Sequence, residues 1–149
     1  MHAVHIAVGV AVLVSSAAAA LWGGWCWHRG LVSPLFWRLL RTSQVTLVVQ
    51  VLLGGLLLLD GRDPPRLHLL YGLLPLGVSF IAEQLRLVAA EQVLARRDLE
   101  DARAMERLPE AEQRAIVAEI VGRETGVMAA SALVVLLCAA RAAGWLSVG

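Results

Sequence analysis

Four long apolar segments constrain this chain more than any other feature of its sequence. They cover approximately residues 5–25, 43–59, 66–87 and 126–145. A helix that spans the hydrocarbon core of a bilayer needs roughly 20 mainly apolar residues. The second segment is the shortest, but Arg41 and Thr42 can continue its helix toward the N-terminus. The sequence therefore predicts four membrane-spanning helices, which form a single domain over residues 1–149.

The composition of the chain also differs from that of a soluble protein. Hydrophobic residues make up 58% of the 149 residues and charged residues only 17%, whereas a soluble domain is about half apolar and about a quarter charged. The formal net charge of +1 provides no basic surface of the kind that attracts nucleic acid. We therefore expect the lipid bilayer, and not a nucleic acid, to be the main partner.

The distribution of arginines between the connecting segments predicts the orientation of the chain. Basic residues concentrate in connections that stay in the cytoplasm. The connection between the second and third spans has two arginines, Arg62 and Arg66, which are offset by Asp60 and Asp63. The other two connections are richer in arginine and include Arg29, Arg38, Arg41, Arg96, Arg97, Arg103, Arg107 and Arg114. We therefore predict that these two connections are cytoplasmic and that both termini lie outside the cell.

The third and fourth spanning helices are predicted to continue beyond the bilayer. Helical sequence extends through Glu83 and Glu91 to about Arg97, and it resumes at Pro109, a residue suited to the first turn of a helix. Residues 88–125 should therefore form a helical hairpin that projects into the cytoplasm, with its tip at residues 98–108. The predicted fold is an all-α, antiparallel four-helix membrane bundle with this hairpin as an extension.

Several stretches resemble an uncharacterised family of four-span integral membrane proteins from GC-rich bacteria. They are FWRLLRTSQVTLVVQ (36–50), LHLLYGLLPL (67–76), AEQLR (82–86) and RETGVMA (123–129). The resemblance covers nearly the whole chain, and it implies a multi-pass protein of the bacterial cell membrane. It brings no activity, cofactor or catalytic residue with it.

One group of polar residues is predicted near the inner face of the membrane. Folding the third and fourth helices about residue 103 places Glu83 opposite Arg123 and Arg86 opposite Glu119. Charged groups within a span are costly and are often functional, but neighbouring opposite charges reduce that cost. The group can therefore be an ion or proton site, a docking surface, or a salt-bridge set that fixes helix packing. Its members are Gln44, Glu83, Arg86, Glu119, Arg123 and Glu124.

A second polar group is predicted near the outer face. His5 and His68 begin two different spans, and two imidazoles from two helices at one depth can ligate a b-type haem. Tyr71 lies one turn from His68, and arginines can pair with haem propionates. The hypothetical haem site comprises His5, His68, Tyr71, Arg66 and Arg141.

The outer residues also allow simpler interpretations. His5, His68 and Cys138 together can form a copper or zinc site, and a quinone-like ligand can rest against Tyr71 and His68. Histidine also has an apolar body and a polar tip, so it can lie at a membrane interface without any ligand. Gln50, in the middle of the second span, is expected to need a hydrogen-bond partner on another helix or on a bound ligand.

No motif for nucleotide binding or for hydrolytic catalysis occurs in the sequence. We therefore expect a non-enzymatic structural or accessory membrane protein, which contacts a partner through its cytoplasmic hairpin. That partner is either a further copy of the chain or a larger membrane complex. Two alternatives remain: an electron-transfer or sensor protein with bis-histidine haem, and a small oligomeric channel or transporter that uses Gln50, Glu83 and Arg123.

Overall fold

A computed structural model describes residues 2–99 and 102–145 of the chain. These residues form helices with no strand. The helices are α1 (His2–Arg29), α2 (Pro34–Leu59), α3 (Arg66–Arg96), the short α4 (Ala102–Met105) and α5 (Glu110–Ala142).

The helix ends follow from local sequence. Gly30, with φ +64°, ends α1 in the left-handed conformation that glycine adopts without strain. Ser33 then caps α2, because its hydroxyl accepts a hydrogen bond from the Phe36 amide, and Pro34 occupies the first turn. Pro109 precedes α5, where its missing N–H is not needed, and Glu110 and Glu112 in the first turn favour the helix dipole.

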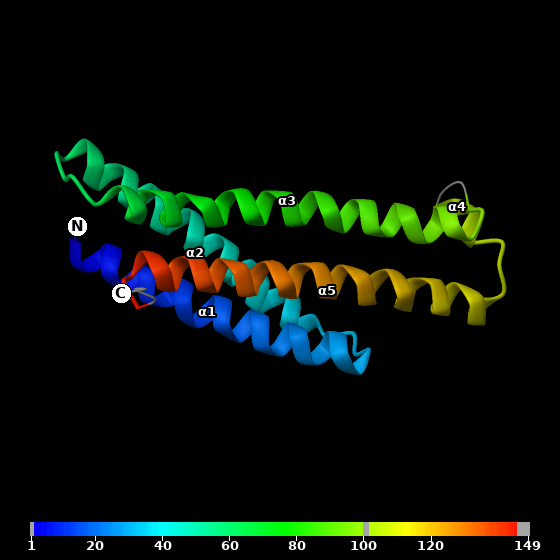
Figure 1. Cartoon of the computed structure of the whole chain (residues 1–149). Helices are drawn as coiled ribbons and strands as arrows, with labels where there is room; N and C mark the ends of the chain where they lie inside the picture. The colour runs from blue at the N-terminus through cyan, green and yellow to red at the C-terminus, as the bar shows by residue number, and fades with distance from the viewer. Residues whose placement is uncertain (1, 100–101, 146–149) are drawn as a thin grey trace.

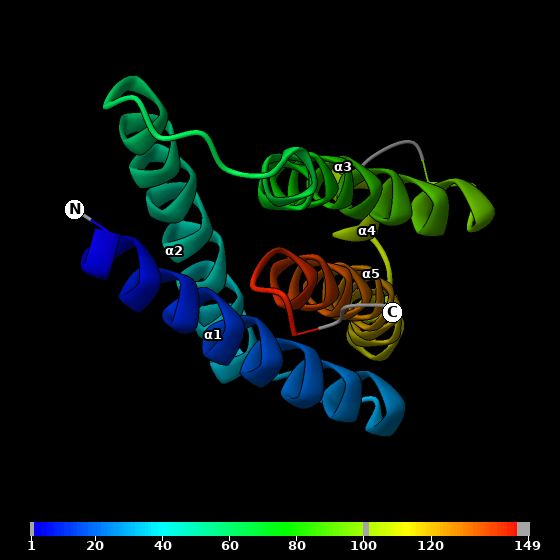
Figure 2. The same ribbon diagram turned by 60° about the vertical axis from the view of Figure 1, so that its left-hand side comes forward.

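The helices pack as two pairs, with α5 at the centre. Figure 2 shows α1 beside α2 and α3 beside α5, and α5 also packs along α1. In the most apolar window of α5, 39% of the residues are buried, against 17–22% in the other long helices. By contrast, α2 contacts α3 only sparsely. The bundle is therefore organised around α5.

The core is divided into two apolar clusters that both include α5. The larger one contains Phe36 and Leu40 from α2 and Met128 from α5, and it closes against the small residues Ala19 and Ala82. The other joins residues of α1, α2 and α5, namely Val12, Leu47 and Val135. Between α1 and α2, the hydroxyls of two buried serines, Ser16 and Ser43, are hydrogen bonded at 2.8 Å. Small and weakly polar residues thus let the helices approach closely.

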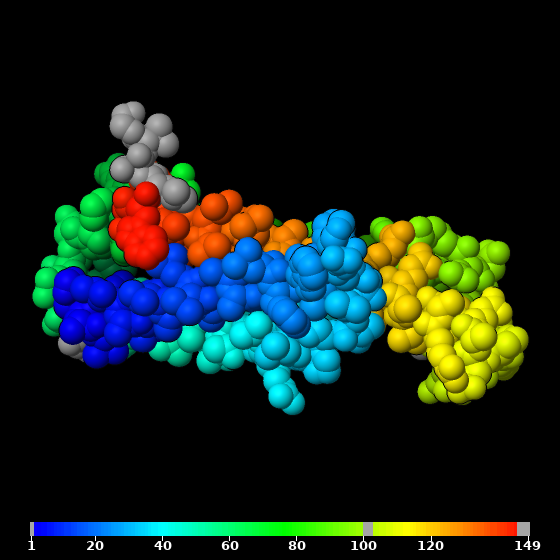
Figure 3. Space-filling view, turned by 90° about the horizontal axis from the view of Figure 1, so that it is seen from below, coloured from blue at the N-terminus to red at the C-terminus, as the bar shows by residue number. Residues whose placement is uncertain are grey.

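The α3–α5 pair extends well beyond the other two helices. In Figure 1 and Figure 3, the end of the molecule that carries α4 and the start of α5 projects past the connection between α1 and α2. The end of the connection between α4 and α5 is bonded to the first turn of α5. The side-chain amide of Gln113 donates to the backbone carbonyl of Leu108 at 2.9 Å. Two fully buried residues, Val93 and Ile116, pack within this extension.

Each predicted apolar segment corresponds to a helix that is long and apolar enough to cross a membrane, namely α1, α2, α3 or α5. The fourth segment was predicted to reach residue 145, but α5 ends at Ala142. The helices are longer than the predicted spans. In particular, α2 begins at Pro34, nine residues before the predicted start of the span, because Ser33 and Pro34 supply the helix-start signals. The predictions that the third helix ends near Arg97 and that the last begins near Pro109 are confirmed. The short helix α4 within the connection was not predicted.

Candidate functional sites

Two polar layers keep the names of the membrane faces that the sequence predicts for them. The outer polar layer consists of His5 on α1, Gln50 on α2 and His68 on α3. The ring centroids of the two histidines lie 6.2 Å apart, with the rings tilted by 53°. Gln50 donates from its amide nitrogen to Nε2 of His5 at 3.1 Å, so Gln50 has the interhelical partner that the sequence predicts. The expectation that His5 and His68 approach each other is also confirmed.

His68 is oriented by the backbone of α5. Its Nδ1 donates to the carbonyl of Ala142 at 2.9 Å, which leaves Nε2 as the acceptor nitrogen of a neutral ring. The guanidinium of Arg141 lies 5.8 Å from the centre of the Tyr71 ring, a cation–π contact. Arg66 begins α3 and is exposed. Of the proposed haem residues, the structure thus pairs His5 with His68 and Tyr71 with Arg141.

The outer layer contains two buried polar atoms that have no partner in the described part of the chain. They are Nδ1 of His5 and Oε1 of Gln50. An unpaired buried polar atom is costly, so these two atoms mark a place where a water molecule or ligand group can add hydrogen bonds. The residues described do not include a group of three metal-ligating side chains, so Cys138 is not gathered with His5 and His68. Cys26 and Cys138 are both buried and free.

The inner charged layer is centred on Glu83 of α3. Its carboxylate accepts a hydrogen bond from Arg41 at 2.5 Å and one from Gln44 at 2.9 Å, both of which come from α2. Arg86, one turn along α3, lies 3.2 Å from the other carboxylate oxygen. The Arg86 guanidinium also lies 5.5 Å from the centre of the Trp37 ring. This layer ties α2 to α3, which otherwise have few contacts.

A third polar group holds the extension together and is named here the hairpin latch. It consists of Arg96, Arg97, Glu119 and Arg123. Arg96 and Arg97 at the end of α3 reach the two carboxylate oxygens of Glu119 at 2.8 and 3.0 Å. The Nε of Arg123 lies 3.7 Å from the same carboxylate. The hydrogen bond from Arg97, together with the charges of Arg96 and Arg123, lowers the pKa of the Glu119 carboxyl.

The ion pairs of the hairpin latch show that α3 and α5 pack in a different register from the one predicted from the sequence. Instead of Arg86, Glu119 contacts Arg96 and Arg97, which lie nearly three helical turns closer to the tip. Glu83 turns toward α2 and does not pair with Arg123. The pairing of Arg97 with Glu119 is symmetric about residue 108, and Gln113 of α5 bonds the carbonyls of Glu106 and Leu108 just before the helix begins. A symmetric fold about residue 103 was therefore wrong.

The six residues that were expected in one inner cluster are divided between different surroundings. Gln44, Glu83 and Arg86 lie in the inner layer, whereas Glu119 and Arg123 belong to the hairpin latch. The channel hypothesis combined Gln50, Glu83 and Arg123, but each of the three has a different set of partners. Glu124 has no ion pair within the ranges that the structure describes.

Sequence reasoning missed Arg41, Arg96 and Arg97 as members of these groups. Arg41 lies three residues before Gln44, so the two side chains share one face of α2, and Arg41 bonds Gln44 at 2.6 Å. That spacing was a signal for Arg41 in the sequence. No comparable signal identified the partners of Glu119, because they depend on how the connection folds.

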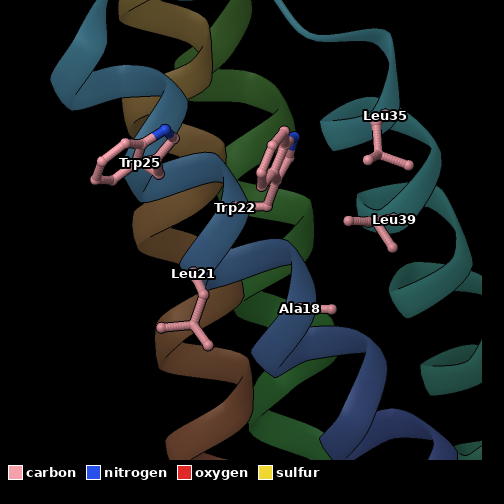
Figure 4. Close-up of a pocket in the computed structure, with 6 residues that line it drawn as sticks. All are labelled: Ala18, Leu21, Trp22, Trp25, Leu35 and Leu39. Atoms are coloured by element: carbon pink, nitrogen blue, oxygen red, sulfur yellow. The ribbon is translucent and has the colours of Figure 1, made fainter.

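Two open grooves lie on the surface of the bundle. Groove A, between α1 and α2, has a volume of about 570 Å³, and its lining is apolar apart from the two indole rings. Figure 4 shows Trp22 pointing across it toward Leu35 and Leu39. The indole N–H of Trp22 donates to the Ser33 hydroxyl at 2.9 Å.

Groove B, of about 500 Å³, is lined by residues of α1, α3 and α5. Its apolar walls include Leu85 and Val88 from α3 and Ala130 from α5. Unlike groove A, it contains a charged side chain, Arg123, and an amide, Gln92.

No protein-family model, no curated protein and no solved structure matches this chain. The class of protein that the fold defines is thus a bundle of four long apolar helices compatible with a membrane protein.

Proposed function

We propose that this chain is a non-enzymatic, multi-pass protein of the cell membrane, which anchors a cytoplasmic helical hairpin for contact with a partner. In this proposal α1, α2, α3 and α5 cross the bilayer as an antiparallel bundle with both termini outside. The partner is a second copy of the chain or a larger membrane complex.

The observation that carries this proposal is the extension of α3 and α5 beyond α1 and α2 (Figure 1). At 1.5 Å per residue, the 33 residues of α5 form a helix of about 50 Å, whereas the hydrocarbon core is about 30 Å thick. The excess length has its own buried residues, Val93 and Ile116, and its own ion pairs in the hairpin latch. An ordered extension of this kind supports a contact role better than a loose loop does.

The exposed side chains also differ between the four-helix bundle and the extension of α3 and α5. Large apolar side chains of the bundle are exposed to their surroundings, as for Leu52 at 63% and Phe80 at 68%. Lipid tails can cover such side chains at no cost. The extension exposes charged groups instead, such as Glu110 and Arg114, whose ion pair at 2.8 Å is almost fully solvated. The two surfaces suit a bilayer and an aqueous partner, respectively.

Site-specific photocrosslinking in cells tests the contact role. A photoreactive amino acid at the exposed positions Arg103 or Glu112 should yield a discrete crosslinked product. The same amino acid at Leu52, on the apolar surface, serves as the control and should not yield it. Replacing residues 97–109 with a short Gly-Ser linker should abolish the product. Identical products from Leu52 and Arg103, or none from the extension, would contradict the proposal.

The membrane topology has a separate test. Single cysteines introduced at Arg62 and Arg103, in a variant with Cys26 and Cys138 replaced by alanine, report the side of the membrane. A membrane-impermeant thiol reagent added to intact cells should label position 62 and not position 103. Labelling of position 103 and not of position 62 would show that the orientation is opposite to the one proposed.

A b-type haem protein is a second candidate, because His68 has a specific feature of a metal-ligating histidine. Its Nδ1–H is held by the Ala142 carbonyl, the arrangement that orients the other ring nitrogen toward a metal. For His5, however, the bond from Gln50 occupies Nε2, so this nitrogen must release Gln50 before it binds iron. Absorption spectra of the purified protein, oxidised and reduced, distinguish the candidates. A Soret band that disappears in His68→Ala supports haem, whereas a featureless spectrum from protein expressed with haem supplied excludes it.

A further inference from the structure

We propose that groove B binds one anionic phospholipid, with its phosphate at Arg123 and an acyl chain along the apolar wall. The inference rests on the membrane placement proposed above, and it adds a ligand site that the contact role does not require. The polar groups of the groove, the charge around Arg123 and the depth of the site each support it.

The polar groups that line groove B are hydrogen-bond donors suited to an anion. They belong to Arg123, Gln92 and Trp27, and the residues that the structure describes place no carboxylate side chain in the lining. The Trp27 ring packs against α5 at Gly126. A Cβ atom added at this glycine would lie only 2.7 Å from Nε1 of the Trp27 ring. A phosphate in the groove can accept hydrogen bonds from the side chains of Arg123 and Gln92.

Arg123 shares its one carboxylate partner with two other arginines. Both oxygens of Glu119 already accept short hydrogen bonds, from Arg96 at 2.8 Å and from Arg97 at 3.0 Å. The Nε of Arg123 lies 3.7 Å from that carboxylate, which is beyond hydrogen-bond distance. Three arginines therefore share one glutamate. The Arg123 side chain is 40% exposed, and it lines the groove. A phosphodiester would give Arg123 an anionic partner that it does not share with Arg96 and Arg97.

The rest of groove B is suited to an acyl chain. Leu85, Val88 and Ala130 line it, and the first two are about half exposed, at 51% and 42%. In the proposed topology, Arg123 and Trp27 lie at the cytoplasmic interface, where indole rings and lipid phosphates are found. Basic pockets between spanning helices on this side of a membrane recognise anionic head groups. Groove A has apolar walls but no charged side chain, so it lacks this selectivity.

Native mass spectrometry of the full chain in detergent micelles tests the proposal. The probes are phosphatidylglycerol and phosphatidylcholine, which share acyl chains but differ in net charge. Wild type should retain one phosphatidylglycerol molecule and bind phosphatidylcholine at least tenfold more weakly. Arg123→Gln should weaken phosphatidylglycerol binding about tenfold, the effect of losing a charged hydrogen bond. The fold should survive this substitution, because Arg96 and Arg97 still hold Glu119.

Two further variants separate the parts of the site. Arg114→Gln removes an arginine of the same helix outside the groove, and it should bind phosphatidylglycerol as wild type does. Ala130→Leu leaves every charge in place but fills the apolar wall, and because Ala130 is exposed the bundle should still fold. This variant should lose most of the bound lipid.

Several outcomes would overturn the proposal. They are equal retention of the two lipids, equal losses in Arg123→Gln and Arg114→Gln, and undiminished binding in Ala130→Leu. Competition by inorganic phosphate as strong as that by phosphatidylglycerol would assign the site to free phosphate instead of lipid. The thiol-labelling test is independent of lipid binding, so failure of the membrane topology can be distinguished from failure of this site.

Discussion

The four-helix body and the α3–α5 extension are held together by different interactions. In the body, α1 approaches α2 and α5 through small residues, and Gly23 lies directly against the Phe36 ring. In the extension, two buried apolar residues, Val93 and Ile116, are flanked by the ion pairs of the hairpin latch. The body relies on close packing, whereas the extension combines apolar burial with charge.

This difference follows from the surroundings that we propose for each region. Lipid tails are as apolar as leucine, so helices in a bilayer gain little from apolar burial alone and depend on close contact. In water, burial of Ile116 is itself favourable, and exposed ion pairs add little. The inner charged layer around Glu83 lies at the boundary of the two regions. Substitutions in the body, the extension and the boundary can therefore be used to test the comparison.

The largest effect is expected in the body, for Gly23→Val. The new side chain would overlap the Phe36 ring and come within 3.0 Å of the Ala129 Cβ. We expect a loss of about 3 kcal/mol in the free energy of unfolding, at the upper end for overpacking. Unfolding by sodium dodecyl sulfate in mixed micelles, followed by circular dichroism, measures it.

The adjacent glycine provides a matched control. A Cβ at Gly24 meets no atom within 4 Å, so Gly24→Val should change the stability by no more than about 0.5 kcal/mol. Equal effects at the two positions would show that close packing at Gly23 does not hold the body together.

The next largest effect is expected in the extension, for Ile116→Ala. Ile116 is fully buried, so its truncation should cost about 2 kcal/mol. Hydrogen exchange should accelerate over residues 110–120 and remain unchanged in α1 and α2. Val117→Ala is the control, because Val117 is 45% exposed. Faster exchange throughout the body would mean that the two regions unfold as one unit.

A smaller effect is expected at the boundary, for Glu83→Gln. The amide can still bond Gln44 but loses the ion pairs with Arg41 and Arg86. Because the Arg41 side chain is half exposed, the expected loss is about 1 kcal/mol. Glu91→Gln, at an exposed position of the same helix, should be close to neutral in the same unfolding assay. If Glu83→Gln lowered the free energy of unfolding as much as Gly23→Val does, the Glu83 ion pairs would be buried away from water.

The smallest effect is expected in the hairpin latch, for Glu119→Gln. Its arginine partners lower the pKa of the Glu119 carboxyl, so its stabilisation is present at neutral pH and above. It is lost as the pH falls through the lowered folded-state value. Hydrogen exchange at the ends of α3 and α5 should accelerate slightly in the variant, and the difference should shrink in high salt. A difference that persists in high salt or at acid pH would contradict an ionic role.

The prediction from sequence was accurate where the determining interactions are local. Apolar length identified the four long helices, and Pro109 and the charges near it identified the start of α5. The approach of His5 to His68 also followed from connectivity, since each begins its own helix. The same reasoning brought Gln44 to Glu83 across a short connection.

Only the tertiary structure decided which charges meet between α3 and α5. A shift of a few residues in a long connection moves every later contact by a helical turn or more, and nothing in the local sequence specifies that shift. The register of the two helices places Glu119 beside Arg96 and Arg97 as well as Arg123, whose side chain also lines groove B. The amino-acid sequence determines the helices through local chemistry, whereas their register depends on packing between residues far apart in the chain.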